Sequence, residues 1–369
     1  MLENYHLRNY NFKLLILVLM ASIFGTIMIN SADSSYLKKQ CIGLIICLTG
    51  MIVLSLINYK SIRKFHWFLY GFNLILLLAV LINGTEANGA TRWLGSPDVI
   101  TIQPSEFSKI ILIICAADFL AEHMESINTV KTLAGYALLC AFPLILIVAQ
   151  PDLSTTIDIF VILCSMLFVA GVSYKLIGVA ILCSIPLIGS FLWYIKLPNP
   201  PFMKDYQVER ILAFLYPEDY VATTRYQQDN SVMAIGSGQL FGKGLNSSTL
   251  ATVKDANLIS EQQTDFIFSV VGEELGFVGS ILIIVILGLI VVQCIRTARK
   301  SSDDMGMLIA TGVAALIGFQ TFINIGVATA LLPNTGIPLP FISYGLSSLV
   351  SSCAAIGLVM NVSLQRRKY

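Results

Sequence analysis

Charged residues are scarce in this sequence. Asp, Glu, Lys and Arg make up 12% of the 369 residues, whereas hydrophobic residues make up 56%, and the mean hydropathy is +0.78. A water-soluble globule needs more polar surface than this composition supplies, so the sequence predicts a polytopic membrane protein. The formal net charge is only +1, which gives no electrostatic basis for nucleic-acid binding, and we expect no nucleic-acid partner.

The sequence also lacks the spacing of a metal site or a disulfide framework. It has three His residues, and its eight Cys residues lie in or beside apolar runs without a CxxC or His/Cys pattern. Small apolar packing is the favoured interpretation of such cysteines, over disulfides or metal ligands. We predict no protein-bound metal from them, and the redox compartment cannot be deduced.

Long apolar runs dominate the chain and predict an all-α protein with about ten transmembrane helices. The first run is too long for the hydrophobic part of a signal peptide, so we expect it to be retained. The ten runs are Phe12–Ile29, Cys41–Ile57, Trp67–Ile82, Phe107–Leu120, Leu133–Val148, Leu153–Val172, Leu176–Ile195, Phe266–Val292, Met305–Leu331 and Gly345–Val362.

Basic residues predict the orientation, because Lys and Arg concentrate in short cytoplasmic connections. With ten helices both termini lie on one side, and we predict that this side is cytoplasmic. Residues 1–369 then form one transmembrane domain, with a large extracytoplasmic loop, residues 196–263, between the seventh and eighth helices. The basic residues that fall on the predicted cytoplasmic side are Arg8, Lys13, Lys60, Arg63, Lys64, Lys131, Lys175, Arg296, Arg299, Lys300, Arg366, Arg367 and Lys368.

Asp265 lies where the long polar loop meets the eighth apolar run. An ionised carboxylate at this boundary is costly unless it is paired or hydrated, which makes Asp265 a candidate functional residue. The alternative is an acid that caps the helix start or interacts with its dipole. Position alone does not separate the two.

Other polar residues fall on the same predicted outer side. Arg92 stands beside a Trp and fits either a lipid headgroup contact or ordinary snorkelling. Glu106 and Lys109 are three residues apart at the start of an apolar run, which predicts an intramembrane ion pair facing a cavity. Asp152 follows Gln150-Pro151 and either caps the next helix or faces the same region. Asp158, in mid-span, is predicted to face the bundle interior, and we assign it no role.

Two further segments are unusual for a membrane protein. A glycine-rich run around Lys243, residues 236–244, fits either a phosphate cradle formed by backbone amides or a flexible tether. Near the C-terminus, Pro333, Pro338 and Pro340 lie between two apolar runs. Irregular backbone at membrane depth needs burial in protein or a wet cavity, so we expect this segment, including Ser343, to line the pocket of Asp265.

Six motifs occur in order along the chain. They are Gln103-Pro104-Ser105-Glu106 with Lys109, Gln150-Pro151-Asp152-Leu153, Ala234-Ile235-Gly236-Ser237-Gly238, Phe241-Gly242-Lys243-Gly244, Thr264-Asp265-Phe266-Ile267-Phe268 with Glu273-Glu274, and Pro338–Gly345. Together they resemble the SEDS family, the RodA, FtsW and SpoVE proteins of shape, elongation, division and sporulation, and their residues are most similar to RodA. The chain departs from the family pattern at Ser154, Gln239 and Leu346, where glycine is usual, and at Ser260-Glu261, where Pro-Glu is common; these departures concern local turn geometry.

The resemblance implies a peptidoglycan glycosyltransferase of the bacterial cytoplasmic membrane. Such an enzyme polymerises lipid II into glycan strands at the outer face, for elongation, division or sporulation, by inverting hexosyl transfer from a polyprenyl-pyrophosphate donor. Its partners would be lipid II, the growing strand, membrane lipids and a class B penicillin-binding protein, a transpeptidase. No cofactor is required by the motifs, and a divalent cation, Mg²⁺ or Mn²⁺, stays open.

The chemistry of the residues agrees with this activity. The acceptor hydroxyl needs a base, which we assign to Asp265, and a pyrophosphate leaving group needs cations. Arg92 and Lys109 are the candidates for the pyrophosphate, Glu106 would hold Lys109 in place, and Asp152 would orient substrate or a helix. Lys243 and Ser343 complete the set of predicted substrate-binding residues.

Two other classes of function remain at this point. A flippase or transporter for a lipid-linked substrate would suit ten helices with interior charges, although alternating access places its site near the membrane midplane and no internal repeat is evident. A non-catalytic scaffold of the cell-wall machinery would need neither an intramembrane Lys109 nor a boundary Asp265.

Overall fold

The computed structural model describes residues 10–87, 90–96, 100–197, 203, 205–220, 224–246, 252–254, 256 and 258–365. The terminal basic residues used for the orientation, Arg8, Arg366, Arg367 and Lys368, lie outside this part of the chain, as do several residues of the 196–263 loop. The α-helices of the described part are α1 Phe12–Ala32, α2 Leu37–Leu56, α3 Tyr59–Arg63, α4 His66–Asn83, α5 Pro104–Glu122, α6 Val130–Ala149, α7 Leu153–Val169, α8 Tyr174–Ile195, α9 Asp205–Leu215, α10 Thr224–Ser237, α11 Ile267–Arg299, α12 Asp304–Ala328 and α13 Leu346–Leu364.

The structure confirms the predicted fold class, a polytopic helical membrane protein. Each of the ten apolar runs forms a helix, and eight helices of the described residues are long and apolar enough to cross a membrane. The other two predicted spans are α5, whose 19 residues include four charged side chains, and α7, which has 17 residues.

A small antiparallel sheet was not expected from the sequence. It has the order β1-β2-β3 and consists of β1 Thr85–Ala87, β2 Ala90–Ser96 and β3 Ile100–Ile102. Thr85 pairs with Trp93, and Leu94 pairs with Ile102. β1 and β3 are too short to show a periodicity, β2 has no regular alternation of apolar and polar residues, and the sheet ends directly before α5.

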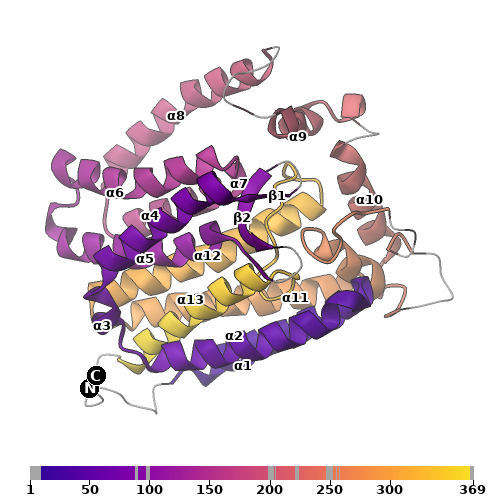
Figure 1. Ribbon diagram of the computed structural model, residues 1–369, viewed down its shortest axis with the longest axis horizontal. Helices are drawn as coiled ribbons and strands as arrows, with labels where there is room; N and C mark the ends of the chain where they lie inside the picture. Colours follow the sequence, from indigo (N-terminus) through magenta and orange to yellow (C-terminus); the bar gives the residue numbers. More distant parts are fainter. Residues whose placement is uncertain are drawn as a thin grey trace.

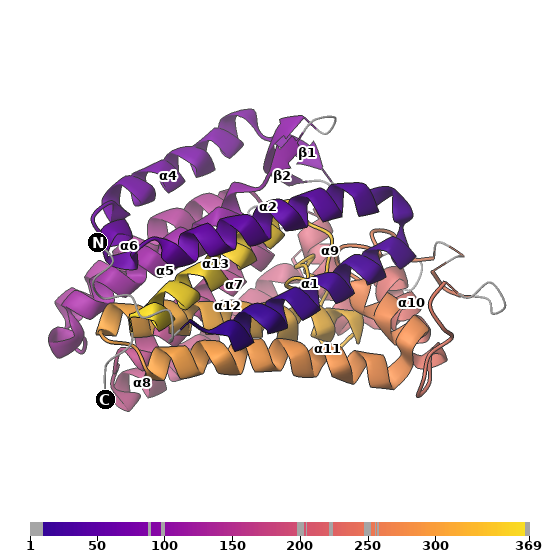
Figure 2. The ribbon, with the colours of Figure 1, turned by 90° about the horizontal axis from the view of Figure 1, so that it is seen from below.

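The helices form a bundle around α12 and α13 (Figures 1 and 2). α13 packs against α2 and α12, while α12 also packs against α11, α7 and α5, and α1 lies along α11. α8 differs from the others because its side chains are exposed along nearly its whole length, with only Ile195 buried. Figure 1 draws α8 at the edge of the bundle, so its apolar surface faces lipid.

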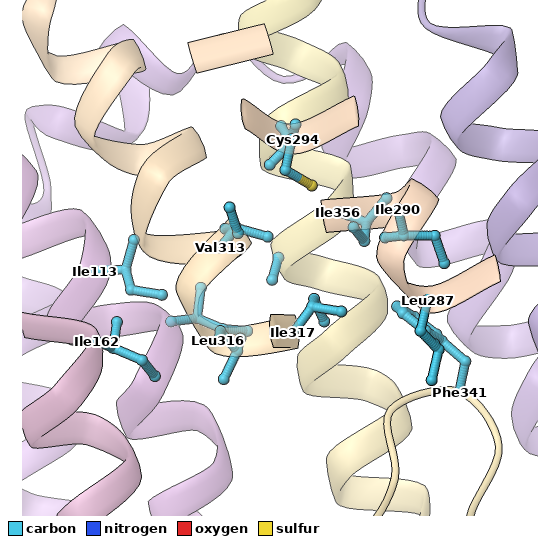
Figure 3. Close-up of a cluster of buried hydrophobic side chains, with 14 of the residues drawn as sticks. Ile113, Ile162, Leu287, Ile290, Cys294, Val313, Leu316, Ile317, Phe341 and Ile356 are labelled. Carbon is cyan, nitrogen blue, oxygen red and sulfur yellow. The ribbon is translucent and has the colours of Figure 1, made fainter. Parts of the chain in front are cut away.

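The apolar core joins these helices in the middle of the bundle (Figure 3). Ile113 of α5 and Ile162 of α7 approach Val313 and Leu316 of α12, and all four side chains are fully or almost fully buried. On the other side of α12, the core continues through Leu287, Ile290 and Cys294 of α11, Ile317, Ile356 of α13, and Phe341 from the loop before α13. This shared core fixes the ends of α5, α11 and α12, which hold the site described below.

The glycine-rich segment is held against a break in α11. Gly276 has φ 63° and ψ −159° within the helix, and a Cβ there would lie 2.4 Å from the amide nitrogen of Gly242. The backbones pair through Lys243 N to Glu273 O at 2.9 Å and Phe277 N to Gln239 O at 2.8 Å. The segment is therefore fixed in place and is not a flexible tether. Gln239 has a left-handed backbone, φ 51°, a conformation that glycine adopts most readily.

Candidate active site

A cavity of about 290 Å³ opens at the end of the bundle where α1 ends and α11 begins. Its walls come from β2, the start of α5, α9, the turn before α11 and the proline-containing loop before α13. Among the lining residues are Arg92, Glu106, Arg210, Glu261 and Asp265. Residues far apart in the sequence thus bring two arginines and three carboxylates to one space.

A hydrogen bond to its backbone carbonyl holds Asp265 beside this cavity, and its side chain does not cap α11. Phe266 is the N-cap residue of α11, with no side-chain cap hydrogen bond, and the first turn contains no acidic residue. The capping interpretation of Asp265 is therefore wrong. The carbonyl of Asp265 accepts a hydrogen bond from Asn324 Nδ2 at 2.8 Å. The carboxylate itself is left to face the cavity.

The proline-containing loop closes over the same turn, as the sequence predicted. Ser343 donates from Oγ to the Thr264 carbonyl at 2.6 Å, and Tyr344 N donates to the Gln263 carbonyl at 2.9 Å. Gly336 has φ 73°, and a Cβ on it would lie 3.2 Å from Asp265 Oδ2 and 3.9 Å from Arg210 Nη1. A glycine is needed here because the backbone is left-handed and passes close to both charged groups.

Arg210 is the residue that the sequence analysis missed. It lies on α9, the amphipathic helix of the long loop, and its guanidinium group stacks over Tyr206 with Cζ 5.6 Å from the ring centre. Tyr206 and Arg210 are four residues apart on one face of the helix, and this spacing was the available signal. Nothing in the sequence indicated that this face turns towards Asp265.

The surroundings of Asp265 make its carboxyl group a weaker acid than that of an exposed aspartic acid. The pKa of the Asp265 carboxyl is raised to about 6: burial is the largest cause, the charges of Arg210 and Arg92 lower the pKa, and the charge of Glu261 raises it. Burial also lowers the pKa of the Arg210 guanidinium, while the charge of Asp265 raises it. A carboxyl group with a pKa near neutrality can accept a proton under physiological conditions, as a general base must.

Arg92 lines the cavity, and Asp152 is buried behind it. Arg92 Nη2 donates to the Pro151 carbonyl at 2.6 Å and to Tyr206 Oη at 3.1 Å, and Arg92 Nη1 lies 3.5 Å from Asp152 Oδ1. Asp152 also caps α7, because its Oδ1 accepts from Thr155 N at 3.2 Å. Asp152 thus caps α7 and pairs with Arg92, and its role toward a substrate stays a prediction. Arg92 has three partners, Pro151, Tyr206 and Asp152, and is therefore not simply a snorkelling side chain.

Glu106 and Lys109 form the buried ion pair that their spacing suggested. Lys109 Nζ lies 2.7 Å from Glu106 Oε1 and 3.8 Å from Asp158 Oδ2, and all three side chains are almost completely buried. Glu106 lines the cavity, whereas Lys109 is not among its lining residues. Asp158 faces the bundle interior, as predicted.

The remaining predicted residues lie outside the cavity. Lys243 makes an ion pair with Glu273 at 2.7 Å, in the contact between the glycine-rich segment and α11. Ser343 is buried, accepts from Leu339 N at 2.8 Å and donates to the Thr264 carbonyl. The structure therefore does not bring Lys243 to Asp265, and it places Ser343 behind the turn that carries Asp265.

A divalent cation would need oxygen ligands that the cavity does not supply alone. Within the described part of the chain, no group of three or more His, Cys, Asp or Glu side chains is arranged to hold a metal ion. Mg²⁺ is often held by one or two carboxylates together with substrate phosphates. Glu106, Glu261 or Asp265 could serve such an ion only together with a phosphorylated ligand.

These features define a class: a helical membrane protein with a partly buried carboxylate and two arginines in a cavity at one end of the bundle. The sequence profile of the FtsW, RodA and SpoVE family, described as cell cycle proteins, matches residues 8–368. The chain belongs to this family.

Named relatives span nearly the whole chain. A probable peptidoglycan glycosyltransferase FtsW from Geobacter metallireducens is 34% identical over 98% of this chain and 96% of its own length. The peptidoglycan glycosyltransferase MrdB of Escherichia coli is 32% identical over 96% of this chain and 93% of its own. FtsW and RodA-type names both occur, so the comparisons do not separate the division and elongation branches.

Solved structures agree with the fold. A chain from a study of how a peptidoglycan synthase complex coordinates polymerization and crosslinking matches with a TM-score of 0.78 and 29% identity, covering 96% of this chain and 97% of its own. The rod shape determining protein RodA of Thermus thermophilus matches with a TM-score of 0.69 and 27% identity, covering 98% of both chains.

Proposed function

We propose that this protein is a peptidoglycan glycosyltransferase that polymerises lipid II at the outer face of the bacterial cytoplasmic membrane. The observation that carries the proposal is Asp265, a carboxylate without a capping role that faces a cavity beside Arg210. The names of the FtsW and MrdB relatives support the reaction class.

The proposed reaction is a single displacement with inversion at the anomeric carbon of the donor. A hydroxyl oxygen of the acceptor saccharide forms the new glycosidic bond, and the bond from the anomeric carbon to the pyrophosphate oxygen breaks, with its electron pair leaving on the pyrophosphate. Asp265 takes the proton of the attacking hydroxyl. Positioned bases of this kind contribute about 10²- to 10⁴-fold to rate.

Arg92 and Arg210 are assigned to the pyrophosphate. Both line the cavity, and a guanidinium group can donate two parallel hydrogen bonds to phosphate oxygens while keeping its charge. A pyrophosphate leaves as an anion, so cations assist its departure without a protonating acid. The buried pair of Glu106 and Lys109 supports the cavity from inside the bundle. The hydrocarbon chain of lipid II would lie on the membrane side.

We infer that the partner is a class B penicillin-binding protein, which crosslinks the strands that this chain would make. The support is the fold similarity to a chain of a peptidoglycan synthase complex. A carrier function is less well supported, because the cavity lies at one end of the bundle and alternating access requires a site reachable from both sides.

The test is polymerisation of purified lipid II by the protein in complex with its penicillin-binding partner. We expect Asp265→Asn to reduce the rate about 10²- to 10⁴-fold, because the amide cannot accept the proton. Expression and melting temperature should be maintained, since the substitution removes a carboxylate whose pKa is already raised by burial. Lipid II binding should also persist through the arginines.

Asp229→Asn is the matched control, because Asp229 is an exposed partner of Arg225 on α10, outside the cavity. It should polymerise at the wild-type rate. An Asp265→Asn protein as fast as this control would remove the catalytic assignment. A wild-type complex that moves lipid II across vesicles without polymerising it would establish the carrier instead.

A further inference from the structure

A second cavity, of about 780 Å³, lies next to the active-site cavity. It is bounded by the outer end of α1, the short 3-10 helix Ser34–Tyr36 and the segment 259–263. Glu261 lines both cavities, and Asp265 follows four residues later on the same turn. The second cavity therefore borders the proposed reaction centre.

Uncharged polar groups dominate the lining of this second cavity. Amide and hydroxyl side chains are contributed by Asn30, Ser31, Ser34, Asn246, Ser260, Gln262 and Gln263, and the charged residues of its lining are Asp33 and Glu261. Such a surface does not suit a pyrophosphate, because its charged lining residues are carboxylates, and Lys254, which lies behind Ser31 and Asn246, is buried and paired with Glu274. It suits hydroxyl and N-acetyl groups, which donate to carboxylates and exchange hydrogen bonds with amides.

Gln262 carries the strongest sign that a ligand belongs here. Its side chain is only 7% exposed, and its Nε2 donates to the Ala32 carbonyl at 3.1 Å. Its Oε1 is buried and has no hydrogen-bond partner among the described residues. A buried acceptor without a partner costs about 1–3 kcal/mol, and a donor on a bound molecule would recover that free energy once the Gln262 amide turns towards the cavity that it lines.

The wall between the two cavities is a well-defined turn. Glu261 has φ 56°, and its carbonyl accepts from Thr264 N at 3.1 Å and from Thr264 Oγ1 at 2.9 Å. Gln263 Nε2 donates to Glu261 Oε2 at 3.1 Å. A ligand seated in the second cavity would thus meet a fixed surface whose other end carries Asp265.

We propose that this second cavity binds the N-acetylated saccharide of the acceptor, with its attacking hydroxyl directed across the Glu261–Asp265 turn to the active-site cavity. The inference rests on the proposed glycosyltransferase function and divides the substrates between the cavities. The arginine-lined cavity receives the donor pyrophosphate, and the amide-lined cavity receives the uncharged sugar that attacks it.

Two tryptophan substitutions test this division. Ser34 and Ser35 are both exposed residues of one 3-10 helix, and of the two only Ser34 lines the second cavity. In the complex with the penicillin-binding partner, we expect Ser34→Trp to raise the KM for lipid II about three- to tenfold, the loss expected for one or two hydrogen bonds, and to shorten the strands. Ser35→Trp should match wild type in KM, kcat and strand length.

Gln262→Leu is a second variant that separates binding from folding. It removes the unsatisfied oxygen, which favours stability, and the Nε2 hydrogen bond to the Ala32 carbonyl, which opposes it, so the melting temperature should stay close to wild type, while the KM should rise as for Ser34→Trp. A direct probe needs no turnover: a tetrasaccharide of N-acetylglucosamine should slow hydrogen exchange of residues 30–34 and 259–263 in the wild type and not in Ser34→Trp.

The outcomes distinguish this inference from the proposed function. If the wild-type complex makes no polymer, the glycosyltransferase function itself fails. If it does make polymer, but Ser34→Trp and Gln262→Leu keep wild-type KM and strand length and the tetrasaccharide protects neither segment, the acceptor site is overturned.

Discussion

The pKa of its carboxyl group decides the pH range in which Asp265 can act as a general base. This pKa is raised to about 6, chiefly by burial, and the nearby Arg210 keeps it below the value that burial alone would give. A general base works only when ionised, so its rate contribution is absent well below that pKa and reaches a plateau above it. The arginine therefore sets the pH at which the site becomes active, in addition to any contact with pyrophosphate.

Arg210→Met tests this electrostatic role. Removing the charge raises the pKa of Asp265, because the interaction that favours the carboxylate is lost. The acidic limb of kcat/KM for lipid II polymerisation should therefore move to higher pH, and the KM should increase. Arg225→Met, which removes the partner of Asp229 on α10, should leave the limb unchanged. Identical midpoints in Arg210→Met and wild type would contradict the pairing of Arg210 with Asp265.

The sequence identified Asp265 but not Arg210, and the reason is physical. Asp265 marks a change from polar to apolar sequence, and the cost of burying a charge there is visible without a structure. Arg210 sits on an amphipathic helix like those that lie along a membrane surface. Its function depends on how α9 docks over the proline-containing loop near Gly336. Long-range docking of this kind leaves no local pattern.

Among the structural elements, α5 and the glycine-rich segment show two ways of holding a lysine. Lys109 on α5 faces two carboxylates, and the second oxygen of Glu106 and both oxygens of Asp158 have no hydrogen-bond partner within the described residues. Glu273, the partner of Lys243, also accepts from Val253 N at 2.7 Å and Lys254 N at 3.2 Å. Loss of Lys109 from α5 should therefore reduce stability and activity more than loss of Lys243 from the glycine-rich segment.

We accordingly expect Lys109→Ala to impair polymerisation and stability more than Lys243→Ala. Breaking a buried pair by removing one partner typically costs about 3–5 kcal/mol, because the remaining charge is left uncompensated. Adding Glu106→Gln to Lys109→Ala should restore part of the melting temperature by removing that charge. Equal and mild effects of the two alanine variants, measured by activity and by melting temperature in detergent, would show that the α5 cluster does not support the cavity.

The sequence was informative about helices and less so about what joins them. The glycine-rich segment gave two interpretations, a cradle or a tether, and the structure instead pairs its backbone with the break at Gly276 in α11. A glycine can permit a close approach between backbones, but the sequence does not say which backbone approaches. The three-stranded sheet before α5 was also missed, because β1 and β3 have only three residues each and the seven residues of β2 do not alternate between apolar and polar.

For the whole molecule, the contacts between helix ends define two opposite ends of the bundle. At one end, Asn11 lies 3.4 Å from Thr297, and Tyr59 N donates to Asn361 at 3.0 Å. At the other, Gln262 contacts the Ala32 carbonyl beside the cavities. In Figure 1 these ends lie on the left and right, marked by α3 and by α10 respectively.

Most basic residues of the short connections lie at the end that holds both ends of the described chain, whereas Lys38, Lys39 and Arg92 lie at the opposite end. Lys60 pairs with Asp303 at 3.0 Å, and Arg63 contacts Asp118 and Glu122 near the end of α5. Lys and Arg near membrane spans favour the cytoplasmic side. The cavities at the opposite end should then face outward, where an acceptor strand would lie.

A pair of reporters tests this orientation in intact cells. A reporter fused after Tyr369 should be cytoplasmic, and one inserted in the exposed turn Pro217–Tyr220 of the long loop, away from both cavities, should be external. Green fluorescent protein, which folds in the cytoplasm, and alkaline phosphatase, which is active outside, give opposite readings at each position. Fusions that retain polymerisation activity serve as controls for folding. Reversed signals at both positions would place Asp265 on the cytoplasmic side and exclude strand synthesis at the outer face.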